Sequence, residues 1–441
     1  MIDEKILFLV HTGCGNTPLK KFEKELHIVA DWDVDIGLGE PLKKLFFRVL
    51  RYDFGKNYAE FGVRKMNDEI IELVRAECPK YVMWPSMNYE ILESTFQAIR
   101  DEGSLILGWF FDDECRFDEY SKWWIPYLDY VLTNDRESVR KYKELGAHAM
   151  HFLITSNPRI FRRLEVPKKY NVSFVGARIA DRKIWVDELK VRGIPVEVFG
   201  KGWRSGYVSL DEMVKIYNES RVNFCFVKSY STAYGIETRP QMKAKIFDIC
   251  MSGGFLLCEY IPGIEEHYKI DKEVVCFKNV EEAAEKIRYF LGHEEEREAI
   301  AQAGWERAHR DHIQSKWLSR IFDKIEEDKE LRSKYSINNP YQFEMPSDIR
   351  RLPSSYHLSW ARILMREGYE KDRWQEELDL ALFYNPDSRG VWWAEQIGRL
   401  PVFIRPFLIR IWTAVEGLRK KLYFRLRSIS SLRKTKRMLF P

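Results

Sequence analysis

The chain alternates short, fully apolar runs with segments of helical periodicity, and this alternation limits the possible folds more than any other feature. Residues 5–10, KILFLV, form a continuous apolar run, which is typical of a strand buried on both faces of a parallel sheet. The glycine-containing residues 11–15 permit a tight turn after it. Helical periodicity over 67–77 and a strand over 80–85 continue the pattern. Strands alternating with helices predict an open α/β sheet with right-handed crossovers.

The same alternation restarts after residues 155–170, where SNPR and VPKK interrupt the regular pattern. We therefore predict two consecutive doubly wound, Rossmann-like domains, over residues 1–160 and 168–315. The predicted strands of both domains, besides the two above, are 104–111, 129–135, 170–177, 195–200, 222–227, 253–260 and 273–278. The predicted helices are 89–101, 136–145, 181–192, 210–219, 241–251, 281–291 and 294–309.

A helical extension is expected over residues 316–398. Within it, residues 360–386 resemble one helix-turn-helix unit of tetratricopeptide type, with Gly368 at the turn and Pro386 after the second helix. About three such repeats are needed for a stable array. We therefore expect this single pair of helices to pack against a neighbouring domain.

The last segment, residues 399–441, is strongly basic. Residues 401–441 contain eleven Lys and Arg and one acid, Glu416, which gives +10 and leaves −6 for the rest of a chain whose net charge is +4. Apolar residues recur in it at intervals of three to four, which predicts a basic amphipathic helix. We expect such a helix to lie on an anionic membrane surface rather than on nucleic acid, and a solvated or partner-bound helix fits the same pattern.

The remaining composition predicts a cytoplasmic protein. Through its tail, we expect it to contact the inner face of the cell membrane peripherally. The seven cysteines are scattered and form no CxxC pair, as expected for reduced thiols. The first residues, MIDEKILFLV, are a poor signal peptide. No run of about 18 uninterrupted apolar residues is present, so we predict no membrane span.

In open α/β sheets, ligands bind beyond the carboxyl ends of the strands. The residues that follow the predicted strands include glycine-rich turns, several acids and a few basic side chains, which fits a phosphorylated polar ligand. One helix-to-strand junction, residues 243–260, carries two lysines and an aspartate at its start. These residues are the first candidates for binding a phosphorylated ligand.

Several segments in order resemble the CgeB-like (spore-maturation type) glycosyltransferases, which are group-1-like enzymes of GT-B fold. The resemblance extends over about residues 1–315 and is strongest after 170. Its segments are WFFDDE, DYVLTNDRESVRKYKELGAHAMHFLITSNPRIF, YNVSFVGARIADRKIWVDELKVRGIPVEVFGKGW, MVKIYNESRVNF, QMKAKIFDICMSGGFLLCEYIPGIEEHY and KEVVCFKNVEEAAEKIRYFLGHEEEREAIAQAGWERAHRDH. It implies two Rossmann-like domains facing each other across a cleft. It also implies transfer of a sugar from a nucleotide-diphosphate donor to a hydroxyl of a glycan, lipid-linked or protein acceptor.

The resemblance implies that the second domain holds the donor, with its diphosphate against a helix N-terminus and basic side chains. Lys245 stands where the family usually has arginine, so it is the first candidate for the diphosphate, and Lys243 is the second. Asp248 occupies the position of the acid that usually binds the ribose hydroxyls, and a carboxylate can accept both hydrogen bonds. Further candidates near the phosphates or the donor sugar are Gly176, Arg178, Glu237, Gly263 and Glu265.

On the acceptor side, Asp112 and Asp113 follow a predicted strand, and either is a candidate general base if the reaction inverts configuration. His11, at the end of the first strand, is the other candidate. Larger retaining families have a glutamate eight residues before the ribose-binding acid, but Pro240 stands there in this chain. Retention or inversion therefore stays open.

We predict no essential metal and no cofactor besides the donor. Two alternatives share the predicted fold. One is a sugar-nucleotide 2-epimerase, and the other is a non-catalytic scaffold whose helical extension and tail recruit partners.

Overall fold

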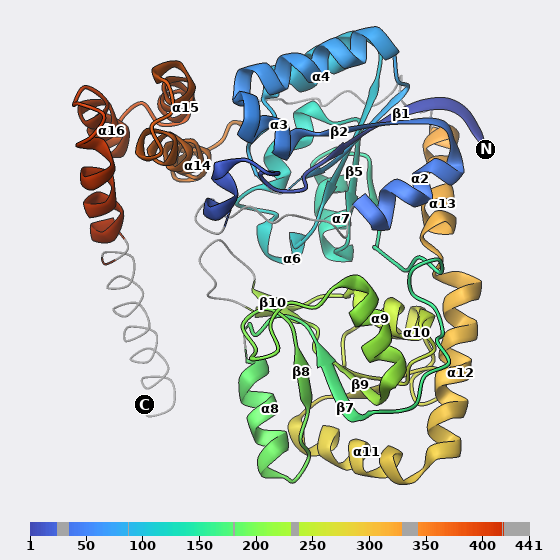
Figure 1. The fold of residues 1–441 in the computed structure, drawn as a ribbon. Helices are drawn as coiled ribbons and strands as arrows, with labels where there is room; N and C mark the ends of the chain where they lie inside the picture. The colour runs from blue at the N-terminus through green and yellow to red at the C-terminus, as the bar shows by residue number, and fades with distance from the viewer. Residues whose placement is uncertain are drawn as a thin grey trace, which may run out of the picture.

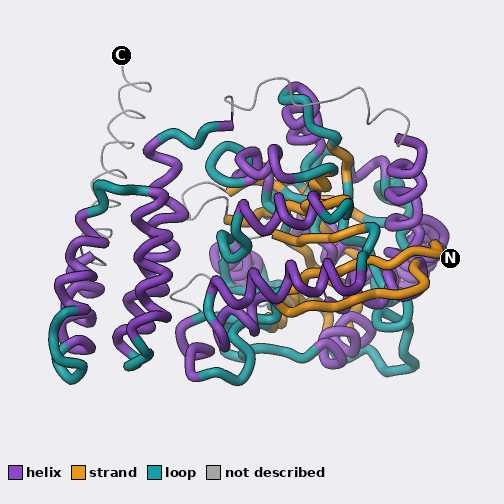
Figure 2. Tube along the Cα trace, turned by 90° about the horizontal axis from the view of Figure 1, so that it is seen from above, coloured by secondary structure: helices purple, strands orange, loops and turns teal. Residues whose placement is uncertain are grey.

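The computed structural model describes residues 1–23, 35–86, 88–179, 181–230, 238–328, 343–416 and 418. Its first half is a parallel six-stranded sheet of order β2-β1-β3-β4-β5-β6, with helices on both faces (Figures 1 and 2). Its strands are β1 (Ile2–Val10), β2 (Phe46–Asp53), β3 (Tyr81–Ser86), β4 (Leu105–Phe110), β5 (Tyr130–Thr133) and β6 (Ala149–His151). Its helices are α2 (Glu40–Leu45), α3 (Phe54–Phe61), α4 (Val63–Glu77), α5 (Glu93–Asp101), α6 (Asp113–Arg116) and α7 (Arg136–Glu144).

The second half is a parallel five-stranded sheet of order β13-β12-β9-β7-β8, accompanied by a short antiparallel pair. The sheet strands are β7 (Tyr170–Val175), β8 (Glu197–Phe199), β9 (Ser220–Cys225), β12 (Leu256–Glu259) and β13 (Val275–Phe277), and the pair is β10 (Lys228–Tyr230) with β11 (Thr238–Pro240). The helices are α8 (Arg182–Val191), α9 (Leu210–Glu219), α10 (Ala244–Met251), α11 (Val280–Gly292) and α12 (Glu294–Asp311). The prediction of two consecutive doubly wound α/β domains is confirmed.

The central strands form because their side chains are apolar on both faces. Residues 6–10 of β1 are fully buried, as are the facing residues of β3 and most of β4, so the sheet core lies between two layers of helices. β2 was not predicted, because its sequence mixes exposed polar residues with apolar ones. Phe47 of this strand is 69% exposed, which is expected of a strand at the edge of a sheet.

Two chain segments connect the domains, and they lie side by side. Ser156 forms a parallel bridge with Ile313, its amide donates to the carbonyl of His312 (3.1 Å), and the amide of Gln314 donates to the carbonyl of Ser156 (2.9 Å). We call residues 155–157 and 312–314 the crossover pair. After it, α13 (Gln314–Glu327) returns to the first domain (Figure 1), where it packs against Phe46 and Tyr81.

The C-terminal extension consists of α14 (Ser347–Arg366), α15 (Lys371–Tyr384), α16 (Arg389–Gly398) and a further helix over 405–416. It stands beside the first domain (Figure 1). The predicted helix pair is present as α14 and α15, with Gly368 in a left-handed conformation (φ 78°) between them. Its first helix begins at Ser347, because Pro353 lies within α14 and does not end it.

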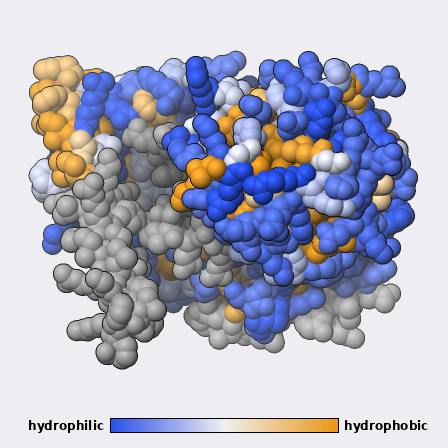
Figure 3. Space-filling model, turned by 90° about the horizontal axis from the view of Figure 1, so that it is seen from below, coloured by the Kyte–Doolittle hydropathy of each residue, from blue (hydrophilic) through white to orange (hydrophobic). Residues whose placement is uncertain are grey.

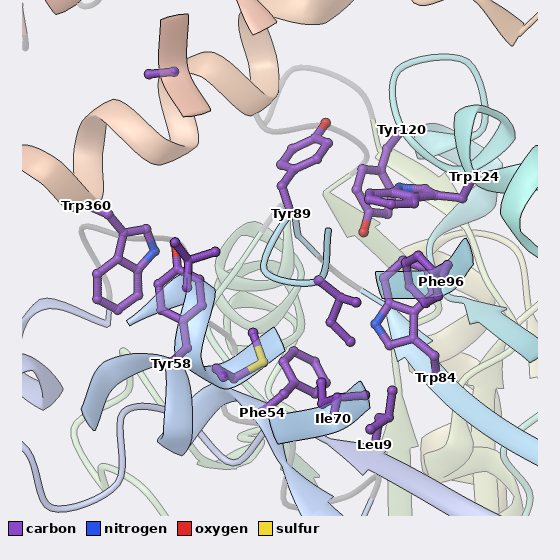
Figure 4. Packing of buried hydrophobic residues seen from close by; sticks show 14 of the residues in the cluster. Leu9, Phe54, Tyr58, Ile70, Trp84, Tyr89, Phe96, Tyr120, Trp124 and Trp360 are labelled. Carbon is purple, nitrogen blue, oxygen red and sulfur yellow. The ribbon is translucent and has the colours of Figure 1, made fainter. Parts of the chain in front are cut away.

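The extension packs into the core of the first domain, as expected of a single helix pair. Trp360 of α14 lies against Tyr58 of α3, with ring centroids 4.7 Å apart (Figure 4). The hydroxyl of Tyr58 also donates to the buried carboxylate of Glu377 (2.9 Å), which in turn lies 2.8 Å from Nδ1 of the buried His357. The hydrogen bond from Tyr58 to Glu377 crosses the contact and, with the ring of Trp360, fixes the extension against the first domain.

None of the described helices is both long and apolar enough to cross a bilayer. The predicted basic tail falls mostly outside the described residues, which end with a helix over 405–416 and residue 418.

Candidate active site

The carboxyl ends of the two parallel sheets face each other, and side chains from the two ends are in contact. Nε2 of Gln241, which precedes α10, donates to Oδ1 of Asp112, which follows β4 (2.6 Å). The same amide lies 3.3 Å from Oε2 of Glu114 in α6. The structure therefore brings Asp112, one of the predicted acceptor-side acids, next to the predicted donor-side helix, at the edge where ligands of α/β sheets bind.

The donor side is lined by positive charge around the end of β7. A methyl group built on Gly176 would lie 2.7 Å from Nζ of Lys245, so the glycine leaves room for the lysine to lie over the strand end. Nζ of Lys245 lies 5.7 Å from the ring centroid of Phe174, and the guanidinium of Arg182 lies 5.4 Å from the same centroid. Two cations thus gather on one aromatic ring, where an anion would be attracted to both.

Arg182 is held in this position by the backbone. Its Nη1 donates to the carbonyl of Ala177 (2.9 Å) and its Nη2 to the carbonyl of Lys228 (3.2 Å), and the residue is buried. The neighbouring Lys228 is engaged by two carboxylates, with its Nζ 3.1 Å from Asp181 and 3.1 Å from Glu259. Lys228 is therefore paired with acids of its own domain.

Lys243 is the N-cap residue of α10, directly before the free backbone N–H groups of its first turn. Its Nζ donates to Oε1 of Gln241. Burial lowers the pKa of Lys243, and the carboxylates of Asp112 and Glu114 oppose this shift. A phosphate group binds readily to a surface of this kind, which consists of the N-terminus of α10 with Lys243 and Lys245.

Asp248 lies on α10 and is buried, with 7% of its surface exposed. Its Oδ1 accepts a hydrogen bond from Oγ of Ser156 in the crossover pair (2.7 Å). Its carboxylate is therefore tied to the connection between the domains. A role in binding ribose stays a prediction.

The remaining donor-side candidates lie in loops. Gly263 is left-handed (φ 92°) after β12, and a methyl group there would meet only Glu266, at 3.9 Å. Oε1 of Glu265 accepts from the hydroxyl of Tyr260 (2.9 Å). Arg178 is exposed, and its amide donates to the carbonyl of Lys201. Glu237 lies outside the described residues.

On the acceptor side, the acids after β4 differ in their surroundings. Asp112 is left-handed (φ 63°) and faces Gln241. Asp113 is 1% exposed and accepts from the hydroxyl of Tyr142 (2.9 Å); burial raises the pKa of Asp113 to about 6. Asp113 thus points into the first domain, whereas Asp112 reaches the second.

Glu114, the next residue, belongs to the same contact. Its Oε1 accepts from Nδ2 of Asn134 (3.3 Å). Burial raises the pKa of Glu114 to about 8, and the charges of Asp135 and Asp112 add to this shift. The carboxyl group therefore holds a proton near neutral pH, as a group that exchanges protons with a substrate does.

His11 follows β1, and both of its ring nitrogens face a partner. Nδ1 accepts from the amide of Gly13 (3.1 Å), and Nε2 lies 3.5 Å from Oε1 of Glu90. Burial lowers the pKa of His11, but the Glu90 carboxylate outweighs burial and the net shift is upward. Oε1 of Glu90 also accepts from the hydroxyl of Tyr356 in α14 (2.7 Å). To act as a base, His11 would have to give up one of these two contacts.

Four residues of this region were not predicted as site residues: Glu90, Glu114, Arg182 and Gln241. Glu114 stands beside the two aspartates in WFFDDE, which was the available signal. Gln241 carries no chemical signature in the sequence and is recognised only by its contact with the first domain.

Among the described residues, no three His, Cys, Asp or Glu side chains are arranged to hold a metal ion. That the protein needs no essential metal and no cofactor besides the donor stays a prediction.

Comparison with solved structures identifies the architecture. The crystal structure of Anabaena Alr3699/HepE in complex with UDP-glucose aligns with a TM-score of 0.52 at 10% identity, covering 74% of this chain and 100% of that one. A glycosyltransferase from Rickettsia africae ESF-5 aligns with a TM-score of 0.50 at 12% identity, covering 74% of this chain and 98% of that one. The chain has the GT-B fold, with two Rossmann-like domains and C-terminal helices.

Residues 181–323 match a family model described as glycosyl transferase-like. These residues include α8, α10 and the cations around β7. A search of curated protein sequences finds no match. The resemblance to glycosyltransferases is thus supported for the second domain, and the narrower CgeB-like assignment stays a prediction.

Proposed function

We propose that the protein is a glycosyltransferase that moves a sugar from a nucleoside-diphosphate donor to an acceptor hydroxyl. One observation carries the proposal. Lys245 and Arg182 lie together at the end of β7. Asp112 and Glu114 lie on the other side of the contact between the domains. One side suits a diphosphate and the other suits proton transfer. Transfer to a hydroxyl requires both.

The donor would bind through its diphosphate to Lys245, Lys243 and the first turn of α10. This geometry supplies N–H groups and positive charge to an anion. Asp248, further along the same helix, would accept hydrogen bonds from the ribose hydroxyls. Gly263 and Glu265 are proposed to border the donor sugar, because their loop follows β12 at the same sheet edge.

In the transfer step, the acceptor oxygen forms a bond to the anomeric carbon while the bond from that carbon to the diphosphate oxygen breaks. The diphosphate leaves with the bonding electrons, and Lys245 and Arg182 stabilise its charge. The hydroxyl proton passes to a base if configuration inverts. We propose Asp112 for this base, with Glu114 beside it, because Asp113 is turned into the first domain.

The acceptor is proposed to be a hydroxyl of a glycan, lipid-linked or protein molecule. The basic segment 399–441 is proposed to hold the enzyme at the inner face of an anionic membrane. Eleven Lys and Arg against one acid between residues 401 and 441 support this location.

Donor binding is the direct test. Thermal unfolding of the full-length protein is followed with UDP, GDP and dTDP and their glucose conjugates. A ligand at about 100 times its Kd adds about 2.7 kcal/mol to the free energy of unfolding, so one of these nucleotides should raise Tm. Lys245→Ala and Asp248→Ala should reduce the shift, whereas Lys183→Ala, an exposed lysine of α8, should keep it. If none of the nucleotides changes Tm, the proposal is wrong.

Product analysis separates transfer from the alternative of 2-epimerisation. Incubation with the bound sugar nucleotide but without acceptor should leave its sugar unchanged or slowly hydrolysed. Accumulation of an epimer of the sugar nucleotide would favour the epimerase instead.

A further inference from the structure

The C-terminal extension exposes a cluster of large apolar side chains that no described residue covers. Figure 3 shows an apolar area over this part of the molecule, next to grey atoms. Trp392 and Trp393 of α16 are each 54% exposed, and their ring centroids lie 5.1 Å apart. We call the following residues the aromatic face: Trp392, Trp393, Val402, Phe403, Phe407 and Ile411.

This exposure is unusual for side chains of this size. Phe403 is 81% exposed and Phe407 is 65% exposed. Contiguous apolar areas on soluble proteins usually mark a binding surface, because leaving them in water is unfavourable. Beneath the face, Val391, Ala394, Ile397 and Ile409 are buried in the extension. The same short helices therefore have one side that packs inward and another that remains uncovered.

The charges around the aromatic face are mainly positive. Residues 389–418 contain four arginines, Arg389, Arg399, Arg405 and Arg410, and two acids. One of the acids, Glu416, is neutralised by Arg362, with Nη1 2.7 Å from Oε2. The following residues, 419–441, add nine Lys and Arg and no acid. An occupant of the face therefore meets apolar side chains bordered by positive charge.

We infer that the aromatic face binds the surface of an anionic lipid bilayer, with its tryptophan and phenylalanine rings inserted at the headgroup level. Tryptophan favours this depth because its ring is apolar and its N–H is polar. Arginines at the border pair with anionic headgroups. A second copy of the chain fits less well, because it would bring two strongly positive segments together.

The inference rests on the proposed membrane contact of segment 399–441 and deepens it, because it assigns part of the contact to folded residues that are fixed on the first domain. The extension is anchored there through Trp360, Tyr58 and Glu377. A contact through this surface orients the whole molecule, whereas a contact through a terminal segment alone would only tether it. The inference does not depend on the chemical reaction, since binding to vesicles requires neither donor nor acceptor.

The test is flotation of the full-length protein with vesicles of phosphatidylcholine alone, and with about 30 mol% phosphatidylserine added. Wild type should float with the anionic vesicles. The double substitution Trp392→Ala/Trp393→Ala should lower the partition coefficient at least about tenfold, because it removes two large interfacial side chains. The control is Ile184→Ala/Val191→Ala, which removes two apolar side chains of α8 that are even more exposed and should float like wild type.

Two additions keep the result interpretable. Thermal unfolding of each variant in the absence of lipid should match wild type, because the substituted side chains are exposed. Brominated phospholipids should quench the tryptophan fluorescence of wild type more strongly than that of the double variant, which reports insertion rather than charge attraction.

Several outcomes would overturn the inference. One is equal flotation of wild type and the double tryptophan variant. Another concerns a full-length variant with Gln at all nine basic positions of 419–441. If this variant no longer binds vesicles at all, and the tryptophan substitutions have no additional effect, the basic segment alone makes the contact. A third is failure of wild type to bind vesicles while it forms a dimer that the tryptophan substitutions dissociate, which would assign the face to a second copy.

Discussion

The two sides of the domain contact carry different ionisable groups, carboxyl groups on the first domain and cations on the second, in different surroundings. On the first domain, burial raises the pKa of Asp113 to about 6 and that of Glu114 to about 8, so Glu114 holds a proton at neutral pH whereas Asp113 does so only below about pH 6. On the second domain, Lys245 and Arg182 lie over the ring of Phe174. An aromatic ring attracts a cation without neutralising it. The first side is thus suited to proton exchange and the second to lasting attraction of an anion.

The largest expected effect concerns proton exchange. Asp112→Asn keeps the shape of the side chain but removes its basicity, so kcat should fall about 100-fold or more. The Kd of the donor should change less than about threefold, because diphosphate binding is assigned to the other side. Product formation and calorimetric donor binding measure the two quantities.

The control for this substitution is Asp118→Asn, an exposed aspartate after α6, which should have no effect on either quantity. An unchanged kcat in Asp112→Asn would remove Asp112 from the proposed mechanism and leave Glu114 as the candidate.

The anion-binding side gives the next effect. Lys245→Ala removes a charge-assisted contact to the diphosphate and should weaken donor binding about 10- to 100-fold. High salt should weaken binding to wild type more than binding to the variant, because the variant has lost part of its electrostatic attraction. Calorimetric titrations at two salt concentrations check both statements. Similar affinities of the two proteins would assign the diphosphate elsewhere.

Glu114 gives a pH-dependent effect on stability. Its pKa is raised to about 8 in the folded protein, whereas the unfolded chain ionises near pH 4.5. Between these values the folded state binds the extra proton, so its stability falls as pH rises. Relative to wild type, Glu114→Gln should gain up to about 4 kcal/mol in the free energy of unfolding as pH rises from 5 to 8.5.

Denaturant unfolding at several pH values measures this difference. Glu137→Gln, at an exposed site on α7, is a control because the hydrogen bond from Arg140 lowers the pKa of that carboxyl, so its substitution should not reproduce the gain. Parallel stability curves for wild type and Glu114→Gln would show that Glu114 is ionised in the folded protein.

The smallest effect is expected at the outer edge of the same contact. Arg136 of the first domain pairs with Glu266 of the second, and both side chains are 51% exposed. Solvent weakens an exposed ion pair, so Arg136→Ala should lower the free energy of unfolding by less than about 1 kcal/mol. Denaturant unfolding checks the value. A larger loss would mean that the charges on this edge contribute as much as the buried ones.

The sequence predicts the two sheets well because their central strands are apolar on both faces. Residues 6–10 of β1 and Leu256–Glu259 of β12 could be recognised in this way. The edge strand β2 could not, because Arg48 and Arg51 break the apolar run. Likewise, the start of α14 was missed because Pro353, which usually ends a helix, lies inside it.

The candidate site was predicted only in part, for a physical reason. Lys243, Lys245 and Asp248 lie close together in the sequence on one helix, so local reasoning could group them. Glu114 and Gln241 are in contact although 127 residues separate them. Only the closure of the two domains brings such residues together, and a single sequence contains no sign of it.

The crossover pair links the two domains mechanically. Because Ser156 and Ile313 are bridged, the two connections between the domains are joined at one place, where a hinge motion of the domains would be centred. Oγ of Ser156 also donates to Asp248, so the proposed ribose-binding carboxylate is attached to that hinge. If a bound nucleoside draws Asp248 away from Ser156, the hydrogen bond at this connection breaks. Donor binding would then be coupled to the angle between the two domains.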